Sequence, residues 1–263
     1  MKPDYKNWMP KGMVNAIAAG TAAVMVLFLL FACGSFPLAG TARLILSILF
    51  GIGSLAMIVF LILGISWYRA FDYNGKRQMS RQIIEGVADY VKIPDGGRGL
   101  DVGCGSGALT IACARRNPKA SMVGIDRWGK EYASFNKPLC ENNAKAEGVS
   151  NVTFQPGNAI KLDFPDGSFD AVTSNYVYHN ITGQNKQDLL LETLRVLKKG
   201  GTFVIHDLMS EDRYGDMKAF AEKLKSMGYE EVRLIDTSKG MFMSEKEGKW
   251  LGLAGSTLLT GVK

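Results

Sequence analysis

The fold of this 263-residue chain is decided by the stretch Leu100-Asp-Val-Gly-Cys-Gly-Ser-Gly-Ala108. An apolar run, which is typical of a buried strand, ends there in a glycine-rich turn, and a helical pattern follows directly. Such a turn lets a nucleotide-like ligand approach the main chain closely, because a side chain at Gly103 or Gly105 would collide with it. Gly103, Gly105 and Ala108 also satisfy the dinucleotide pattern G-x-G-x-x-G/A, so this stretch alone leaves a nicotinamide enzyme open.

Apolar runs alternate with helical stretches on the carboxyl side of this turn. A lead-in helix is predicted over residues 75–93, where apolar residues recur at helical spacing. The predicted strands are 99–102, 122–125, 152–155, 169–174 and 202–206, followed by 231–235 and 256–262 near the end of the chain. The alternation predicts an α/β domain with a Rossmann-like, doubly wound and mostly parallel seven-stranded sheet.

Other segments, in a fixed order, distinguish the two cofactor types. They are Gly124-Ile-Asp126, Gly157-Asn-Ala159, Phe169-Asp-Ala-Val-Thr-Ser-Asn-Tyr176 and Arg195-Val-Leu-Lys-Lys-Gly-Gly201. Together with Asp101 in front of the G-x-G-x-G turn, they resemble the class I S-adenosylmethionine-dependent methyltransferases with a type 11/25-like domain. The resemblance covers roughly residues 75–263, and it implies an enzyme that uses S-adenosyl-L-methionine.

The resemblance also implies a set of cofactor-binding residues. They are Asp101, Gly103, Cys104, Gly105, Gly107, Asp126, Arg127, Asn158, Ala159 and Asn175. Asp101 suits a ligand that carries an ammonium and a sulfonium, and Asp126 is expected to accept both ribose hydroxyls, although an aspartate there could also cap a helix. Arg127 and Trp128 are expected to cover the adenine. Asn158 departs from the aspartate often found in the family, but its amide oxygen can still accept from the adenine amino group.

The segment 175–180 follows the fourth strand, at the edge where ligands of open α/β sheets bind. His179 and Tyr176 are the candidate catalytic residues, with His179 suited to remove a proton from a hydroxyl, phenol or thiol acceptor. A packing or surface role for His179 stays equally open. Tyr178 is expected to pack, and Asp207 to cap a helix or turn. In-line displacement at the sulfonium methyl can proceed by positioning without any dedicated base.

Residues 1–74 differ in composition from the rest of the chain. Between Gly12 and Tyr68 the only charged residue is Arg43. Two transmembrane helices are therefore predicted at about 13–33 and 44–68, joined by a Pro- and Gly-containing turn, in front of a methyltransferase domain at 75–263. A buried soluble hairpin, or a lipoprotein signal at Cys33, is a weaker alternative.

Charge predicts the orientation and excludes one class of partner. Lys and Arg flank the hairpin on both outer sides, which predicts an integral protein of the cell membrane with both termini and the catalytic domain cytoplasmic. The net charge of +6 divides evenly between residues 1–74 and 75–263, without a basic cluster, so no nucleic-acid partner is expected. The four scattered Cys and two His indicate no metal site.

Two other functions compete with methyl transfer. One is a non-catalytic membrane module that senses S-adenosylmethionine. The other is a short-chain dehydrogenase, because Tyr214 and Lys218 form a Tyr-x-x-x-Lys pair after the fifth strand. The favoured acceptor is a small molecule, lipophilic or membrane-associated. The acceptor's identity, the methylated atom and the oligomeric state do not follow from the residues.

Overall fold

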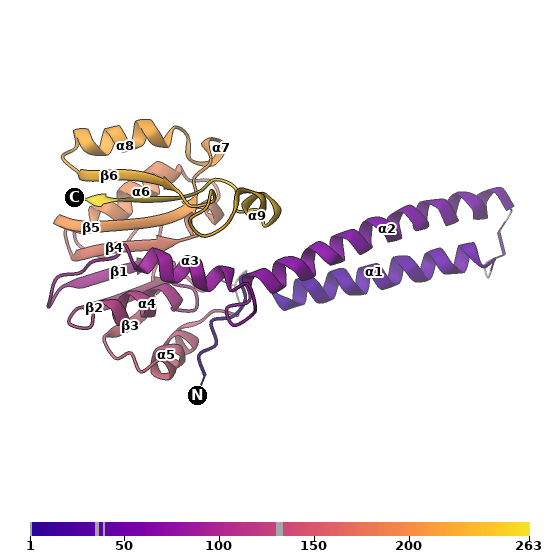
Figure 1. Ribbon diagram of the computed structural model, residues 1–263, viewed down its shortest axis with the longest axis horizontal. Helices are drawn as coiled ribbons and strands as arrows, with labels where there is room; N and C mark the ends of the chain where they lie inside the picture. The colour runs from indigo at the N-terminus through magenta and orange to yellow at the C-terminus, as the bar shows by residue number, and fades with distance from the viewer. Residues whose placement is uncertain (1, 35–36, 39, 130–133) are drawn as a thin grey trace. The chain divides into compact units, whose positions relative to one another are not determined.

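Seven strands form one sheet within the residues that the computed structural model describes, which are 2–34, 37–38, 40–129 and 134–263 (Figure 1). The strands are β1 (Arg98–Val102), β2 (Ser121–Asp126), β3 (Val152–Pro156), β4 (Phe169–Asn175), β5 (Leu197–Leu208), β6 (Glu230–Asp236) and β7 (Ser256–Val262). Their order across the sheet is β3-β2-β1-β4-β5-β7-β6. β1 to β5 run parallel, whereas β7 is antiparallel to both of its neighbours. The predicted Rossmann-like sheet is confirmed.

Helices cover both faces of this sheet. They are α3 (Met79–Ala88), α4 (Ala108–Arg116), α5 (Lys137–Ala146), α6 (Lys186–Arg195), α7 (Glu211–Tyr214), α8 (Met217–Ser226) and α9 (Glu245–Trp250), with a 3₁₀ turn, η2, at Tyr178–Asn180. The crossovers after β1 and β2 move along the sheet in one direction, and those after β4 and β5 move in the other. Because such crossovers are right-handed, α4 and α5 lie on one face and α6 and α8 on the other.

The direction of the crossovers changes between β1 and β4, which are neighbours in the sheet. In doubly wound sheets, a crevice for ligands forms at such a switch point, outside the carboxyl ends of the strands. The glycine-rich turn follows β1 and the segment 176–180 follows β4. The topology therefore brings the two predicted parts of the site to the same edge.

The lead-in helix is shorter than predicted. It begins at Met79 and ends at Ala88, whereas the periodicity indicated 75–93. A turn closed by the Gly75 N–H on the Asp72 carbonyl precedes the helix, and i→i−3 bonds from Tyr90 and Val91 tighten the chain after it. The residues on either side of α3 have helical apolar spacing, but their hydrogen bonds form turns, so they are not part of the α-helix.

The chain groups by its contacts into two units. One comprises residues 7–80, and the other combines residues 2–6 with Arg81–Lys263. The predicted division at residue 74 stays a prediction. The grouping adds that residues 2–6 lie with the unit that contains the sheet, although the hairpin separates the two in sequence.

The unit of residues 7–80 is a helical hairpin, α1 (Lys11–Ala32) and α2 (Gly40–Phe71). Small residues allow close packing between the helices, as where Gly51 lies against Phe28. Many large apolar side chains along both helices are exposed, and Leu55 is 67% exposed. Both helices are long and apolar enough to span a hydrocarbon core of about 30 Å. This exposure does not fit the alternative of a hairpin buried in a soluble core.

Candidate active site

The glycine-rich turn is fixed to the neighbouring strand through its main chain. The N–H groups of Gly103 and Cys104 both donate to the Ile125 carbonyl, at 2.8 and 2.9 Å. The Gly107 N–H then donates to the Cys104 carbonyl at 2.7 Å, which closes the turn, and α4 begins at the next residue. The turn is therefore rigid and lies at the carboxyl end of β1 and β2.

The three glycines of the turn are required for different reasons. All have positive φ, at 76°, 54° and 81° for Gly103, Gly105 and Gly107. A Cβ at Gly103 would lie 2.3 Å from the side chain of Val177, and one at Gly107 would lie 3.0 Å from Phe154. At Gly105 the nearest described atom to such a Cβ belongs to the Phe135 ring, 3.7 Å away, which is an ordinary contact distance. Packing within the protein thus explains Gly103 and Gly107, whereas at Gly105 the described residues leave room for a ligand beside the main chain.

Asp126 ends β2 with its carboxylate beside this turn. One oxygen accepts from the Gly105 N–H at 2.9 Å, and the other accepts from the Trp128 N–H at 2.7 Å. An ionised carboxylate has about four acceptor positions, so it keeps two for a ribose diol. A turn with an open glycine face and an acceptor at its edge fits the nucleoside half of S-adenosylmethionine.

Asp101 lies beneath the turn and is 1% exposed. Its carboxyl accepts from the Thr110 hydroxyl on α4 at 2.6 Å. Burial raises the pKa of Asp101 to about 7, against the opposing effect of the Thr110 hydrogen bond. A cation bound next to Asp101 would therefore favour its ionised form, as expected for a residue that balances the ammonium of the cofactor.

The remaining predicted cofactor residues lie at the ends of β2, β3 and β4. Arg127 is exposed, and the Trp128 indole N–H donates to the Gly105 carbonyl at 2.9 Å. Asn158 is exposed after β3, where its side-chain oxygen accepts from the Ile160 N–H at 3.0 Å and Ala159 follows it. A second lone pair on that oxygen stays available to an adenine amino group.

The acceptor segment after β4 lies directly against the glycine-rich turn. Val177 contacts Gly103, and the Ser174 hydroxyl donates to the Val102 carbonyl at 2.8 Å. These contacts bring the residues after β4 next to the turn that would carry the methyl donor. A reactive group on this segment would therefore lie on the side of the turn where an acceptor can approach.

His179 pairs with Asp207 across the ends of β4 and β5. Its Nδ1 lies 2.5 Å from an Asp207 oxygen, and its side chain is 17% exposed while that of Asp207 is 0% exposed. Burial alone would raise the pKa of Asp207, but the bonds from His179 and from the Leu208 N–H hold it below the ordinary range. An ionised Asp207 requires the proton on Nδ1, which leaves Nε2 of a neutral His179 as a proton acceptor.

Asp207 is the residue whose role was not predicted from the sequence. It was expected to cap a helix or turn, and it does accept main-chain N–H bonds from Tyr178 at 2.8 Å and Leu208 at 2.7 Å. Its further bond to His179 joins residues 28 positions apart. Asp207 follows directly after His206 in the sequence, and no local pattern there distinguishes a cap from the partner of an imidazole.

Tyr176 and Tyr178 are bonded inside the protein. The Tyr176 hydroxyl lies 2.6 Å from that of Ser256, and the Tyr178 hydroxyl lies 2.6 Å from that of Thr193. Burial raises the pKa of both phenols. Neither phenol can take a proton near neutral pH, so Tyr176 can contribute packing and shape to the acceptor side but not general-base chemistry.

Asn175 ends β4 and faces a second, fully buried histidine. Its side-chain oxygen lies 2.8 Å from Nδ1 of His206, whose Nε2 lies 2.8 Å from the Thr237 hydroxyl. Burial lowers the pKa of His206 to about 4, so its imidazole is neutral. This network fixes Asn175 at the edge of the site.

The dehydrogenase alternative does not fit the fold around Tyr214. α7 ends at that residue, Gly215 follows with φ 70°, and Lys218 lies on α8, which Asp216 caps. Tyr214 and Lys218 therefore lie on separate helices. Burial and the nearby Asp207 raise the pKa of the Tyr214 phenol, whereas a proton-exchanging tyrosine needs a lowered one.

Comparison with known proteins shows similarity to methyltransferases. The model of a methyltransferase domain matches residues 100–205, from β1 into β5. The demethylmenaquinone methyltransferase of Geobacillus kaustophilus is 29% identical over 174 residues, which are 62% of this chain and 71% of that protein. The uncharacterized methyltransferase YcgJ of Bacillus subtilis is 36% identical over 110 residues, 42% of this chain and 40% of that protein.

A solved structure shares the fold. The [4+2]-cyclase SpnF superposes with a TM-score of 0.53 at 21% identity, over 73% of this chain and 85% of that one. This likeness concerns the architecture, whereas the matching domain model and the related methyltransferases concern the activity. After its hairpin, the chain is a class I S-adenosyl-L-methionine-dependent methyltransferase.

Proposed function

We propose that the protein is anchored in the cell membrane by α1 and α2, and that it methylates a small lipophilic acceptor which loses a proton during the reaction. The pair of His179 and Asp207 beside the cofactor turn carries this proposal. A buried, ionised aspartate that orients an imidazole is the arrangement expected of a general base. Positioning alone would not need it.

The chemistry assigns a task to each of these side chains. S-adenosylmethionine, when bound, supplies a methyl carbon activated by its sulfonium. Nε2 of His179 accepts the proton of the acceptor as the new bond to the methyl carbon forms and the carbon–sulfur bond breaks. Asp207 keeps the proton on Nδ1 and stabilises the imidazolium that results. The proton leaves His179 to solvent through its partly exposed edge.

Two observations favour a lipophilic acceptor. The hairpin exposes apolar side chains along both helices, as a membrane anchor does. A tethered domain meets membrane-dissolved molecules at a high effective concentration, whereas a freely soluble acceptor gains little from the tether. The similarity to a demethylmenaquinone methyltransferase, which by its name acts on a quinone, points to the same class.

The orientation that we propose has both ends of the hairpin in the cytoplasm. Lys2, Lys6 and Lys11 precede α1, and Arg69, Lys76, Arg77 and Arg81 lie at or after the end of α2. Arg43 is the one charged residue between Gly12 and Tyr68. Cations stay preferentially on the cytoplasmic side, so the methyltransferase unit would face the cytoplasmic pool of its cofactor.

One experiment tests these points together. Sealed inverted membrane vesicles that contain the full chain receive S-adenosylmethionine labelled in its methyl group, and mass spectrometry follows the label in the lipid and aqueous extracts. We expect label in lipid-extractable molecules without detergent. In the His179→Ala variant, we expect turnover to fall by about a hundredfold or more, because general bases contribute roughly 10²–10⁴-fold.

The possible results separate the parts of the proposal. Label confined to the aqueous extract would contradict a lipophilic acceptor. Turnover that appears only after detergent treatment would place the domain on the other side of the membrane. An unchanged rate in His179→Ala would leave positioning as the mechanism, and cofactor binding without any labelled product would support a sensing module instead.

A further inference from the structure

The N-terminal strap, residues 2–6, belongs by its contacts to the methyltransferase unit. Asp4 pairs through its main chain with the side-chain amide of Asn143 on α5. The Asp4 N–H donates to Oδ1 at 2.7 Å, and the Asp4 carbonyl accepts from Nδ2 at 3.0 Å. The next residue, Tyr5, is 4% exposed, and its hydroxyl donates to Glu147 at 3.3 Å. The strap is therefore bonded to α5 through both main-chain groups of Asp4, and a buried aromatic ring packs it in place.

Asn143 joins the strap to the glycine-rich turn. The Asn143 side-chain amide, in a residue that is 2% exposed, also donates through Nδ2 to the Ser106 carbonyl at 3.0 Å. A primary amide has two N–H donors and one acceptor oxygen, and here the strap and the turn use all three groups. An aspartate could not donate to either carbonyl. An alanine would leave the Ser106 carbonyl buried without its partner.

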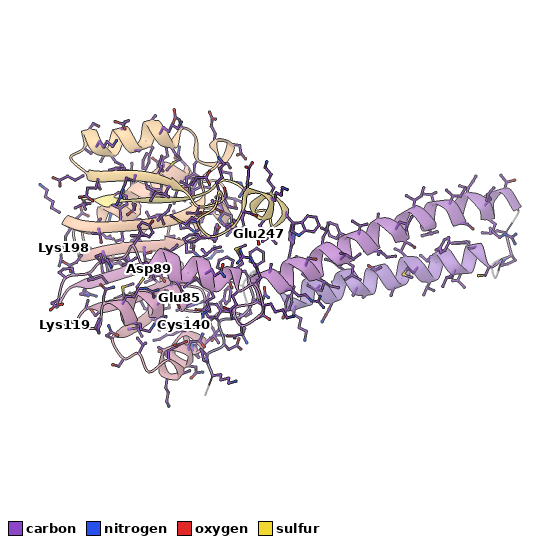
Figure 2. The ribbon with its side chains drawn as sticks, viewed as in Figure 1. Glu85, Asp89, Lys119, Cys140, Lys198 and Glu247 are labelled. Carbon is purple, nitrogen blue, oxygen red and sulfur yellow. The ribbon has the colours of Figure 1, made fainter. Side chains whose placement is uncertain are left out.

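α5 bonds to two successive carbonyls of the turn from one face. Cys140, labelled in Figure 2, lies three residues before Asn143 and donates through Sγ to the Gly105 carbonyl at 3.2 Å. Residues three apart lie on the same side of a helix, so Cys140 and Asn143 act on neighbouring peptides of the turn. The orientation of these peptides determines where the open face of Gly105 points.

We propose that the N-terminal strap positions the cofactor turn, with Asn143 as the positioning residue between them. The inference rests on the assignment of residues 103–107 as the cofactor turn. Asn7, the residue after the strap, belongs to the hairpin unit, so one end of the hairpin continues directly into the segment that Asn143 bonds to the cofactor turn. The affinity for S-adenosylmethionine thus depends on a segment that contributes no atom to the binding site.

The full chain in detergent or lipid nanodiscs provides the test, with calorimetric titration of S-adenosylmethionine in the absence of an acceptor. Asp4→Pro removes the N–H donor to Asn143 while lying outside α5, and it should weaken binding about threefold to tenfold. Asp4→Ala keeps the main-chain pair and is the matched control, with affinity within about twofold of the wild type. Asn143→Ala should weaken binding about tenfold.

The double variant decides whether Asn143 carries the effect. If the strap acts through Asn143, Asp4→Pro adds less than twofold to the loss in Asn143→Ala. If the losses of affinity in the two single variants multiply in the double variant, the strap does not act through Asn143. Equal affinities of Asp4→Pro and Asp4→Ala would overturn the inference itself. A merely structural role would lower the melting temperature alone, whereas positioning raises KM for S-adenosylmethionine at unchanged kcat and speeds hydrogen exchange at residues 105–107 but not in β6 and β7.

A third variant keeps this test distinct from the assignments on which it rests. Gly105→Val should weaken binding by about a hundredfold if the turn receives the cofactor. Binding by that variant at wild-type affinity would refute the turn assignment. Loss of binding in Gly105→Val together with equal behaviour of the two Asp4 variants would refute the strap alone. Neither outcome depends on the acceptor, so the proposed function is tested separately.

Discussion

The cofactor side and the acceptor side of the site are built by different means. On the cofactor side, main-chain groups of one short turn bond to the adjoining strand, and Asp126 accepts from the turn itself. On the acceptor side, the chemistry depends on two side chains, His179 and Asp207, brought together from different strand ends. The cofactor side is thus held in place by the main chain of one turn, whereas the acceptor side depends on side chains that can change without disturbing that turn.

Gly105→Val is expected to have the largest effect, and it acts on the cofactor side alone. A valine there fills the open face of the turn and adopts an unfavourable φ, which together should weaken S-adenosylmethionine binding by about a hundredfold. Calorimetric titration measures the affinity, and thermal unfolding reports the fold.

Gly103→Ala is the matched control for that variant. Its Cβ would meet Val177 rather than the ligand, so it should lower stability, by roughly 1–3 kcal/mol. If Gly105→Val lost as much stability as Gly103→Ala while retaining the cofactor, the two glycines would have the same structural role, and the distinction between them would fail.

Asp207→Asn should affect the acceptor side without changing the cofactor side. The neutral amide no longer stabilises the imidazolium and can present its N–H₂ to His179, so we expect kcat to fall by about tenfold. The affinity for S-adenosylmethionine should stay the same. Steady-state kinetics combined with calorimetry check both statements.

An exposed acidic residue controls for the change of charge. Asp166 is paired with Arg195 at the surface and its side chain is 80% exposed, so Asp166→Asn should change neither quantity. A drop in cofactor affinity in Asp207→Asn would show that the two sides are not independent.

The smallest effect is a pH dependence confined to the cofactor side. The pKa of Asp101 is raised in the folded chain to about 7 from the ordinary 3.8, so between these values the folded protein retains a proton that the unfolded chain has lost. The stability of the cofactor-free protein therefore falls as the pH rises from about 4 to about 7. The cationic cofactor favours the carboxylate, so its affinity should rise about fivefold from pH 6 to pH 7.

Calorimetry in buffers with different ionisation enthalpies would detect the proton released on binding. Asp101→Asn should remove both the proton release and the slope of affinity with pH. A flat affinity profile in the wild type would separate Asp101 from the cofactor and leave it as a structural partner of Thr110.

Local patterns were sufficient to predict the sheet. Each predicted strand lies within an observed one, and the fold class is confirmed, because apolar runs and glycine turns are properties of consecutive residues. The Thr110 hydroxyl on Asp101 and the Asn143 amide on Ser106 were not predicted. Each is a side-chain bond to a residue on another element, and such bonds depend on packing that spacing does not encode.

Local patterns also predict helix boundaries and the partners of single side chains incompletely. The lead-in helix was extended through residues whose spacing is helical but whose hydrogen bonds form turns. The Tyr-x-x-x-Lys pattern at Tyr214 does not form one catalytic helix, because the glycine within it ends α7. Asp207 was assigned to a cap, and that interpretation captured its main-chain bonds but missed His179.

The grouping of residues 2–6 with the methyltransferase unit makes the hairpin, in topological terms, an internal insertion rather than a leading appendage. A water-soluble enzyme is therefore better engineered by excision than by truncation. Replacing residues 7–78 with a flexible linker between Lys6 and Met79 would retain all of α3 and the segment that pairs with Asn143, and lengthening such a linker costs little, about 0.6 kcal/mol per doubling. A version that simply starts after the second helix would lack a piece of its own domain.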